Sequence, residues 1–142
     1  MGQKLPFYFV QIAPYRYIPE AESHALREAQ RKTLALEKTG MAVTLDIGEE
    51  DDIHPANKQD VGNRLARLAL ANDYGKSEVL ASGPLYKNQK LDPSYIDLDF
   101  DYVGSGLRAK KSLQGFEIAG SDSVFYPATA KILDDKVRVS SR

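Results

Sequence analysis

The sequence predicts an α/β fold, in which part of a parallel sheet with its helices is followed by an antiparallel β region. Two apolar runs, at residues 5–13 and 41–45, each precede a segment with helical spacing, so the first half has the order βαβα. After Gly75 the helical spacing ends, and residues 95–102 alternate between apolar and polar side chains. We therefore expect a boundary near residues 76–84, with one domain at 1–78 and a β-rich domain at 79–142.

The first half begins with a nearly continuous apolar run, Leu5–Ala13, which predicts a strand covered on both faces. Residues 20–36 are strong helix formers, and Pro19 is placed to start that helix. Gly40 is expected to end the connection that follows. Two strands alone cannot form a stable doubly wound layer, so further strands are expected elsewhere.

A second strand is predicted at residues 41–45, and the acidic segment 46–54 is predicted to be a loop. Pro55 is expected to open the second helix, which carries apolar residues at spacings of three and four. Gly75 lies where a left-handed cap would end this helix.

The second half predicts antiparallel strands. In residues 95–102 four apolar or aromatic side chains share one face and three aspartates share the other, which is typical of a half-buried strand. Shorter strands are predicted at 116–118 and 124–126. Residues 131–133 and 136–139 flank Asp134–Asp135, a pattern that favours a hairpin.

Composition excludes several classes of function. The 142 residues are 42% hydrophobic and 27% charged, with a net charge of −1, so neither nucleic acid nor an anionic membrane surface is an expected partner. There is no cysteine, which excludes disulfides and thiol chemistry. No apolar run approaches the roughly 20 residues that span a bilayer. The sequence leaves the oligomeric state open.

The strongest candidate for chemistry is His54, which follows four consecutive carboxylates, residues 49–52, at the start of a helix. A carboxylate held against one ring nitrogen fixes the tautomer of a histidine that acts as general base. Asp51, three residues before His54, and Asp52, two residues before it, both fit this orienting role. The alternative is an acidic loop that only stabilises the helix dipole and solubility.

Several ordered motifs resemble the sialate O-acetylesterase family, which are SGNH-type carbohydrate esterases. They are FYFVQIAPY at 7–15, LREAQ at 26–30, TGMAVTLDIG at 39–48, DIHPANKQDVG at 52–62, SGPLY at 82–86 and GFEIAG at 115–120. The resemblance implies that 1–78 is the C-terminal part of a catalytic domain with a flavodoxin-like parallel sheet. It also implies that 79–142 starts a β-rich domain that is cut short.

The resemblance implies a Ser-His-Asp hydrolase that removes O-acetyl groups from sialic acid or other acetylated sugars, with His54 as the base. It also implies no metal and no organic cofactor. The Asp-X-X-His spacing of SGNH enzymes favours Asp51, whereas the Asp-Ile-His-Pro form of this family favours Asp52. The family's Gly-Asp-Ser-like block is absent. We therefore expect a fragment that is inactive by itself. Family members are often exported, which suggests a periplasmic or secreted location.

Other candidates have simpler explanations. Ser105, between two glycines, resembles a nucleophile elbow but falls among predicted strands, so we interpret it as a turn serine. His24 lies near Glu20 and Glu28 at helical spacing, which favours a solvated surface over a metal site. Gln11 and Arg27 belong to the motifs above, and Arg27 is a candidate either for substrate contact or for packing and a salt bridge. The cluster Tyr15–Arg16–Tyr17 is a candidate either for a sugar-stacking platform or for a folded loop. The rival hypothesis is a non-catalytic carbohydrate-binding or interaction module on the same scaffold.

Overall fold

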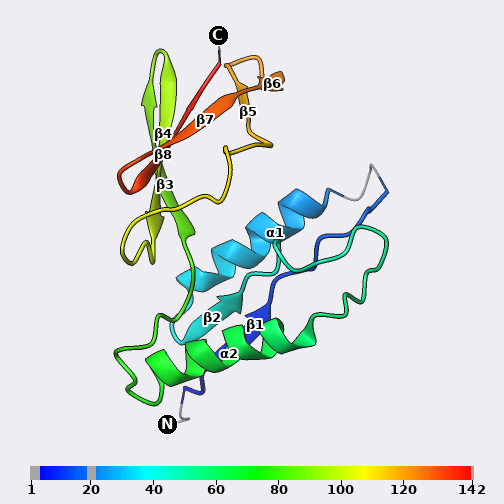
Figure 1. The fold of residues 1–142 in the computed structure, drawn as a ribbon, viewed down its shortest axis with the longest axis vertical. Coiled ribbons are helices and arrows are strands. Elements are labelled where there is room, and N and C mark those ends of the chain that lie inside the picture. Colours follow the sequence, from blue (N-terminus) through cyan, green and yellow to red (C-terminus); the bar gives the residue numbers. More distant parts are fainter. Residues whose placement is uncertain (1–3, 19–21, 142) are drawn as a thin grey trace. The chain divides into compact units, whose positions relative to one another are not determined.

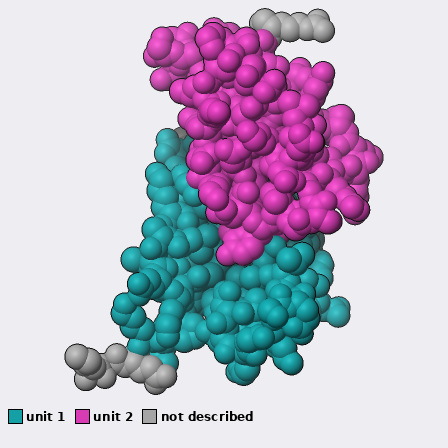
Figure 2. Space-filling view, turned by 90° about the vertical axis from the view of Figure 1, so that its left-hand side faces the viewer, with its two compact units in different colours: residues 1–82 teal, residues 83–142 magenta. Residues whose placement is uncertain are grey.

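The computed structural model describes residues 4–18 and 22–141, and the chain divides into two compact units (Figure 2). The first unit is Met1–Ser82 and the second is Gly83–Arg142. The division at Ser82 falls inside the segment 76–84. Each unit has its own sheet or sheets, so the two are described separately.

The first unit has the order βαβα, as predicted (Figure 1). Its elements are β1 (Phe7–Val10), α1 (Ser23–Lys32), the 3₁₀ turn η2 (Thr33–Ala35), β2 (Thr39–Ala42) and α2 (Lys58–Asn72). The strands β1 and β2 are parallel, with Phe7 opposite Thr39 and Val10 opposite Ala42. The α/β class with a parallel strand pair is therefore confirmed for this unit.

A glycine permits the closest packing in the first unit. A Cβ atom on Gly40 of β2 would lie 2.7 Å from Tyr8 Cδ1 and 3.0 Å from Leu68 Cδ2. Only glycine therefore lets Tyr8 of β1 and Leu68 of α2 both lie this close to β2. The Tyr8 hydroxyl also donates a hydrogen bond to Asp73, just after α2. Burial and this hydrogen bond raise the pKa of Tyr8.

The end of β1 is held by a side chain from α1. The Gln30 Oε1 accepts a hydrogen bond from the Ile12 backbone N–H at 2.9 Å, and its Nε2 donates to the Val10 carbonyl at 3.4 Å. These two groups lie at the edge of β1 away from β2, where no strand pairs within the described residues. The Gln30 carboxamide thus supplies the donor and acceptor that a neighbouring strand would otherwise provide.

The prediction that residues 5–13 form a strand covered on both faces is wrong for this chain. The strand β1 is shorter, at Phe7–Val10, and Phe7 and Val10 are 62% and 37% exposed. The first helix is also shorter than predicted, because Leu36 adopts an extended backbone and ends η2. Pro19 and Glu20 lie outside the described residues.

The boundaries around β2 and α2 also need correction. Gly40 lies within β2 and does not end the preceding connection, and residues 43–45 belong to the loop after the strand. Pro55 does not open the second helix. Instead Asn57 is the N-cap, since its side-chain oxygen accepts a hydrogen bond from the Asp60 N–H at 3.1 Å. Gly75 has a left-handed backbone, as predicted, with φ +65°.

The second unit is antiparallel β, as predicted. Its strands are β3 (Leu85–Asp92), β4 (Tyr95–Asp101), β5 (Glu117–Ala119), β6 (Phe125–Pro127), β7 (Thr129–Leu133) and β8 (Lys136–Ser140). Four of them form a sheet in the order β3-β4-β8-β7, and β5 pairs with β6. The core gathers around Ala130, Val137 and Val139, with Leu98 and Phe100 packed against them.

The hairpin predicted around Asp134–Asp135 is confirmed as β7–β8, with Asp134 in a left-handed turn at φ +55°. The strand β3 was not predicted. From Lys87 to Asp92 its residues are exposed at the edge of the sheet, so it lacks the apolar alternation that marks a half-buried strand.

The polar face of β4 is not uniformly open to solvent. Asp97 is only 7% exposed and accepts two hydrogen bonds from the Arg138 guanidinium of β8, at 2.7 and 2.9 Å. The same guanidinium lies 3.5 Å from the ring centroid of Tyr95. The Arg138 hydrogen bonds are the main reason that the pKa of Asp97 is lowered. This ion pair replaces the apolar packing that the other face of the strand uses.

We expect Gly40→Ala to lower the free energy of unfolding of the first unit by about 1–3 kcal/mol, because the new methyl group overlaps Tyr8. Gly62→Ala is the matched control, since nothing lies within 4 Å of a Cβ at that position of α2. It should instead stabilise the helix by about 0.5–1 kcal/mol. Denaturant unfolding followed by amide NMR signals of α2 measures both effects. Equal effects would contradict the packing assigned to Gly40.

The ion pair of Asp97 with Arg138 predicts how the stability of the second unit depends on pH. Because the folded-state pKa of Asp97 is lowered, its contribution to stability is present above the ordinary aspartate pKa of about 3.9 and is lost as pH falls below it. In Asp97→Asn the second unit should therefore lose less stability on acidification than wild type does. Acid unfolding monitored by amide signals of β8 tests this. Asp134→Asn, at an exposed turn, should keep the wild-type dependence.

Candidate functional site

Two loops follow the carboxyl ends of the parallel strands and lie side by side (Figure 1). We call residues 11–18 the first loop and residues 43–57 the histidine loop. The Thr44 hydroxyl, which is buried, donates a hydrogen bond to the Gln11 carbonyl at 3.0 Å. In open α/β sheets this edge is where ligands bind, so the fold places the histidine loop at the expected edge.

The two loops touch closely further along. A Cβ on Gly48 would lie 2.2 Å from Cγ of Pro14 and 2.8 Å from its carbonyl oxygen, so only glycine allows this approach. Beyond this contact the Arg16 backbone N–H donates to the Glu50 carbonyl at 2.8 Å. The guanidinium of Arg16 also reaches Glu50 Oε1 at 2.9 Å. The first loop thus holds the acidic part of the histidine loop.

The base of the histidine loop is held by α2. Arg64 donates to the Val43 carbonyl at 2.6 Å and makes a two-fold contact with the Asp46 carboxylate at 2.6 and 2.7 Å. The hydrogen bonds from Arg64 are the main cause that lowers the pKa of Asp46. This planar, charge-assisted pairing fixes the point where the chain leaves β2.

His54 lies near the end of the histidine loop with its side chain 86% exposed. Its backbone N–H donates to Asp52 Oδ1 at 2.7 Å, and its ring Nδ1 is 4.0 Å from the same oxygen. That second distance is beyond a hydrogen bond. Asp51 instead lies 3.2 Å from Arg16 Nη2. Of the two predicted carboxylates, the structure therefore brings Asp52 next to His54 and pairs Asp51 with Arg16.

The acidic segment also contributes to the approach to α2. Glu49 Oε1 accepts a hydrogen bond from the Ala56 backbone N–H at 2.7 Å, and Asp60 lies in the first turn of the helix. These contacts agree with the alternative that the acidic loop supports a helix N-terminus. Glu49 is the carboxylate that supports the approach to the helix, so Asp52 is not needed for that contact and can face His54.

The structure also locates the other candidates. Gln11 is buried, and its Oε1 has no hydrogen-bond partner among the residues that the structure describes. Tyr15 and Tyr17 meet edge to face, with ring centroids 5.2 Å apart. Ser105 lies in a turn after β4 with no helix after it, which agrees with a turn serine. His24 lies in α1, and the described residues contain no cluster of three metal-ligating side chains.

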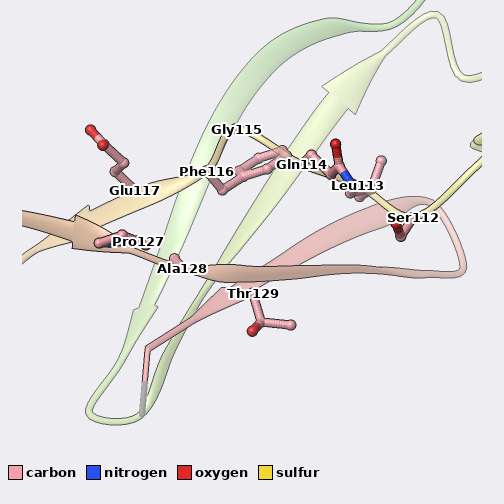
Figure 3. Close-up of a pocket in the computed structure, with 9 residues that line it drawn as sticks. All are labelled: Ser112, Leu113, Gln114, Gly115, Phe116, Glu117, Pro127, Ala128 and Thr129. Carbon is pink, nitrogen blue, oxygen red and sulfur yellow. The ribbon is translucent and has the colours of Figure 1, made fainter.

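A pocket in the second unit lies apart from these residues in the sequence (Figure 3). It has a volume of about 520 Å³ and is lined by residues 112–117 and 127–129. Glu117 is its one ionisable side chain, and none of the residues predicted to carry chemistry lines it. We therefore keep the histidine loop as the candidate site. Among the described residues no helix is long and apolar enough to cross a membrane.

Comparison with known proteins identifies the class. No protein-family model matches the sequence, and no curated protein matches it. A solved carbohydrate acetylesterase matches 96% of this chain at 46% sequence identity, with a TM-score of 0.86. This chain is therefore similar to part of a carbohydrate acetylesterase over nearly its whole length, which confirms the resemblance predicted from its motifs. The matched protein is XAC1771 from Xanthomonas citri, and this chain spans 33% of its length.

The contact between the loops gives a prediction. Gly48→Ala should displace the histidine loop from the first loop, because the new methyl group overlaps Pro14. We expect faster amide exchange at Arg16, whose N–H donates to Glu50, and shifted NMR signals through residues 44–54. Gly83→Ala is the control, since a Cβ there meets nothing within 4 Å. Unchanged exchange at Arg16 in Gly48→Ala would contradict the proposed packing.

Proposed function

We propose that this chain forms the histidine-bearing part of a carbohydrate esterase that hydrolyses O-acetyl esters on sialic acid or other acetylated sugars. The observation that carries the proposal is the 46% identity to a carbohydrate acetylesterase over 96% of the chain. We also propose that β1 and β2 belong to the flavodoxin-like parallel sheet of an SGNH-type hydrolase.

In the proposed reaction His54 is the general base. It takes the proton from a serine hydroxyl as that oxygen attacks the acetyl carbonyl, and it returns the proton to the leaving sugar oxygen. Water then attacks the acetyl-enzyme: the same ring removes a proton from that water and returns it to the serine oxygen as acetate leaves. The serine would come from a segment outside this chain, which spans a third of the matched enzyme.

Asp52 is the proposed orienting carboxylate. Two observations support it over Asp51: its Oδ1 lies 4.0 Å from His54 Nδ1, and Asp51 is engaged by Arg16. A carboxylate in this role holds the ring in one tautomer and stabilises the imidazolium that forms during proton transfer. The hydrogen bond from the His54 backbone N–H to Asp52 Oδ1 already holds this carboxylate close to the His54 backbone.

The test is acetate release from O-acetylated sialic acid and from neutral O-acetylated sugars by the natural protein at the full length that its gene encodes. We expect His54→Ala to lower kcat by about 10⁴-fold or more and Asp52→Asn by about 10³–10⁴-fold. Asp51→Asn, the matched control one position before Asp52, should lose far less.

Each outcome decides between hypotheses. A large loss in Asp51→Asn with little loss in Asp52→Asn would transfer the orienting role to Asp51. If wild type releases no acetate from any of the sugars but binds them, the non-catalytic carbohydrate-binding module becomes the better description. Circular dichroism of each variant controls for unfolding.

A further inference from the structure

The four consecutive carboxylates before His54, residues 49–52, have three different environments in the structure. Glu49 accepts the Ala56 N–H, Glu50 and Asp51 contact Arg16, and Asp52 accepts the His54 N–H. The two carboxylates that contact Arg16 are consecutive in sequence, and Asp52 is the next residue. Contact with a single arginine of the first loop therefore distinguishes Asp51 from Asp52.

We propose that Arg16 is a positioning residue of the active site, which selects Asp52 as the partner of His54 by holding Glu50 and Asp51 away from the ring. This proposal depends on the proposed function of His54. Arg16 acts through the loop, since its own contacts are with Glu50 and Asp51.

The contacts of Arg16 suit this role because they combine main chain and side chain. Its N–H fixes the Glu50 carbonyl at 2.8 Å, its Nε and Nη2 contact Glu50 Oε1 at 3.1 and 2.9 Å, and its Nη2 lies 3.2 Å from Asp51 Oδ1. A guanidinium presents several donors in one plane, so it can hold two carboxylates at once. Lysine, as a single point charge on a flexible chain, holds such a pair less well.

The exposure of these side chains defines what the pairing can do. Arg16, Glu50 and Asp51 are 65%, 72% and 81% exposed. Exposed ion pairs contribute little to global stability, so Arg16 should have almost no effect on the melting temperature. Its effect should appear instead in the local conformation of residues 49–54 and in the identity of the carboxylate that serves His54.

The first experiment uses the 142-residue chain and needs no activity. In Arg16→Gln we expect the His54 amide to exchange with solvent several times faster than in wild type, since its bond to Asp52 depends on a held loop. Arg16→Lys should be intermediate. Lys4→Gln is the matched control, because Lys4 forms a similarly exposed ion pair with Glu37 at 2.6 Å elsewhere in the unit. His54 exchange that is unchanged in Arg16→Gln would overturn the proposal.

The second experiment is a double-mutant cycle on acetate release by the natural full-length protein. Arg16→Gln should lower kcat/KM by about tenfold, mainly through kcat, and Arg16→Lys should restore part of it. In the Arg16→Gln background Asp51 is free to approach His54, so Asp52→Asn should cost about tenfold less than it does in wild type. Strictly additive losses would overturn the selection of Asp52 by Arg16. A wild type without esterase activity would contradict the proposed function, and the exchange experiment would still decide the role of Arg16 in the loop.

Discussion

The parallel pairing of β1 with β2 is the constraint on which the candidate site depends. Parallel strands end at the same edge of a sheet, so this pairing places the first loop and the histidine loop next to each other. The crossover through α1 makes the pairing possible, and Gln30 ties that helix to the end of β1. Without this register Arg16 could not reach Glu50, which is 34 residues later in the sequence.

Close approaches that only glycine allows then make the arrangement specific. Gly40 lets Tyr8 and Leu68 both lie close to β2, and Gly48 lets the histidine loop lie against Pro14. Arg64 links α2 to the histidine loop, because it donates from the helix to the carbonyl of Val43 and to Asp46. Strand packing, helix position and loop conformation are therefore coupled through a small number of contacts.

Periodicity predicted the elements that bury one face and missed those that do not. The alternation of residues 95–102 and the pattern around Asp134–Asp135 gave β4 and the β7–β8 hairpin correctly, since apolar side chains there pack on Val137 and Val139. The edge strand β3 has mostly exposed residues after Tyr86, so backbone pairing with β4 defines it and no apolar pattern does. The start of α2 was misplaced at Pro55 because the hydrogen bond of Asn57 sets the cap.

The candidate site was also predictable only in part. Sequence could identify His54 and its carboxylates by chemical type, but it could not choose between Asp51 and Asp52, because the contact that separates them comes from Arg16, 35 and 36 residues earlier in the printed sequence. Similarly, no local pattern indicates that a buried Asp97 pairs with Arg138 on another strand.

The exposure of His54 shows what the described residues do and do not contribute to catalysis. A carboxylate about 4 Å from an imidazolium gains only about 1 kcal/mol in bulk water, whereas the same pair is far stronger where water is excluded. The side chain of His54 is 86% exposed and that of Asp52 is 56% exposed, so in this structure the pair lies in a weakly interacting environment. The two loops therefore hold Asp52 beside His54, but they do not shield the pair from water. In the proposed enzyme, efficient proton transfer by His54 requires that substrate and the serine-bearing segment exclude water from this pair, which makes the geometry held by Arg16, Gly48 and Arg64 necessary but not sufficient for catalysis.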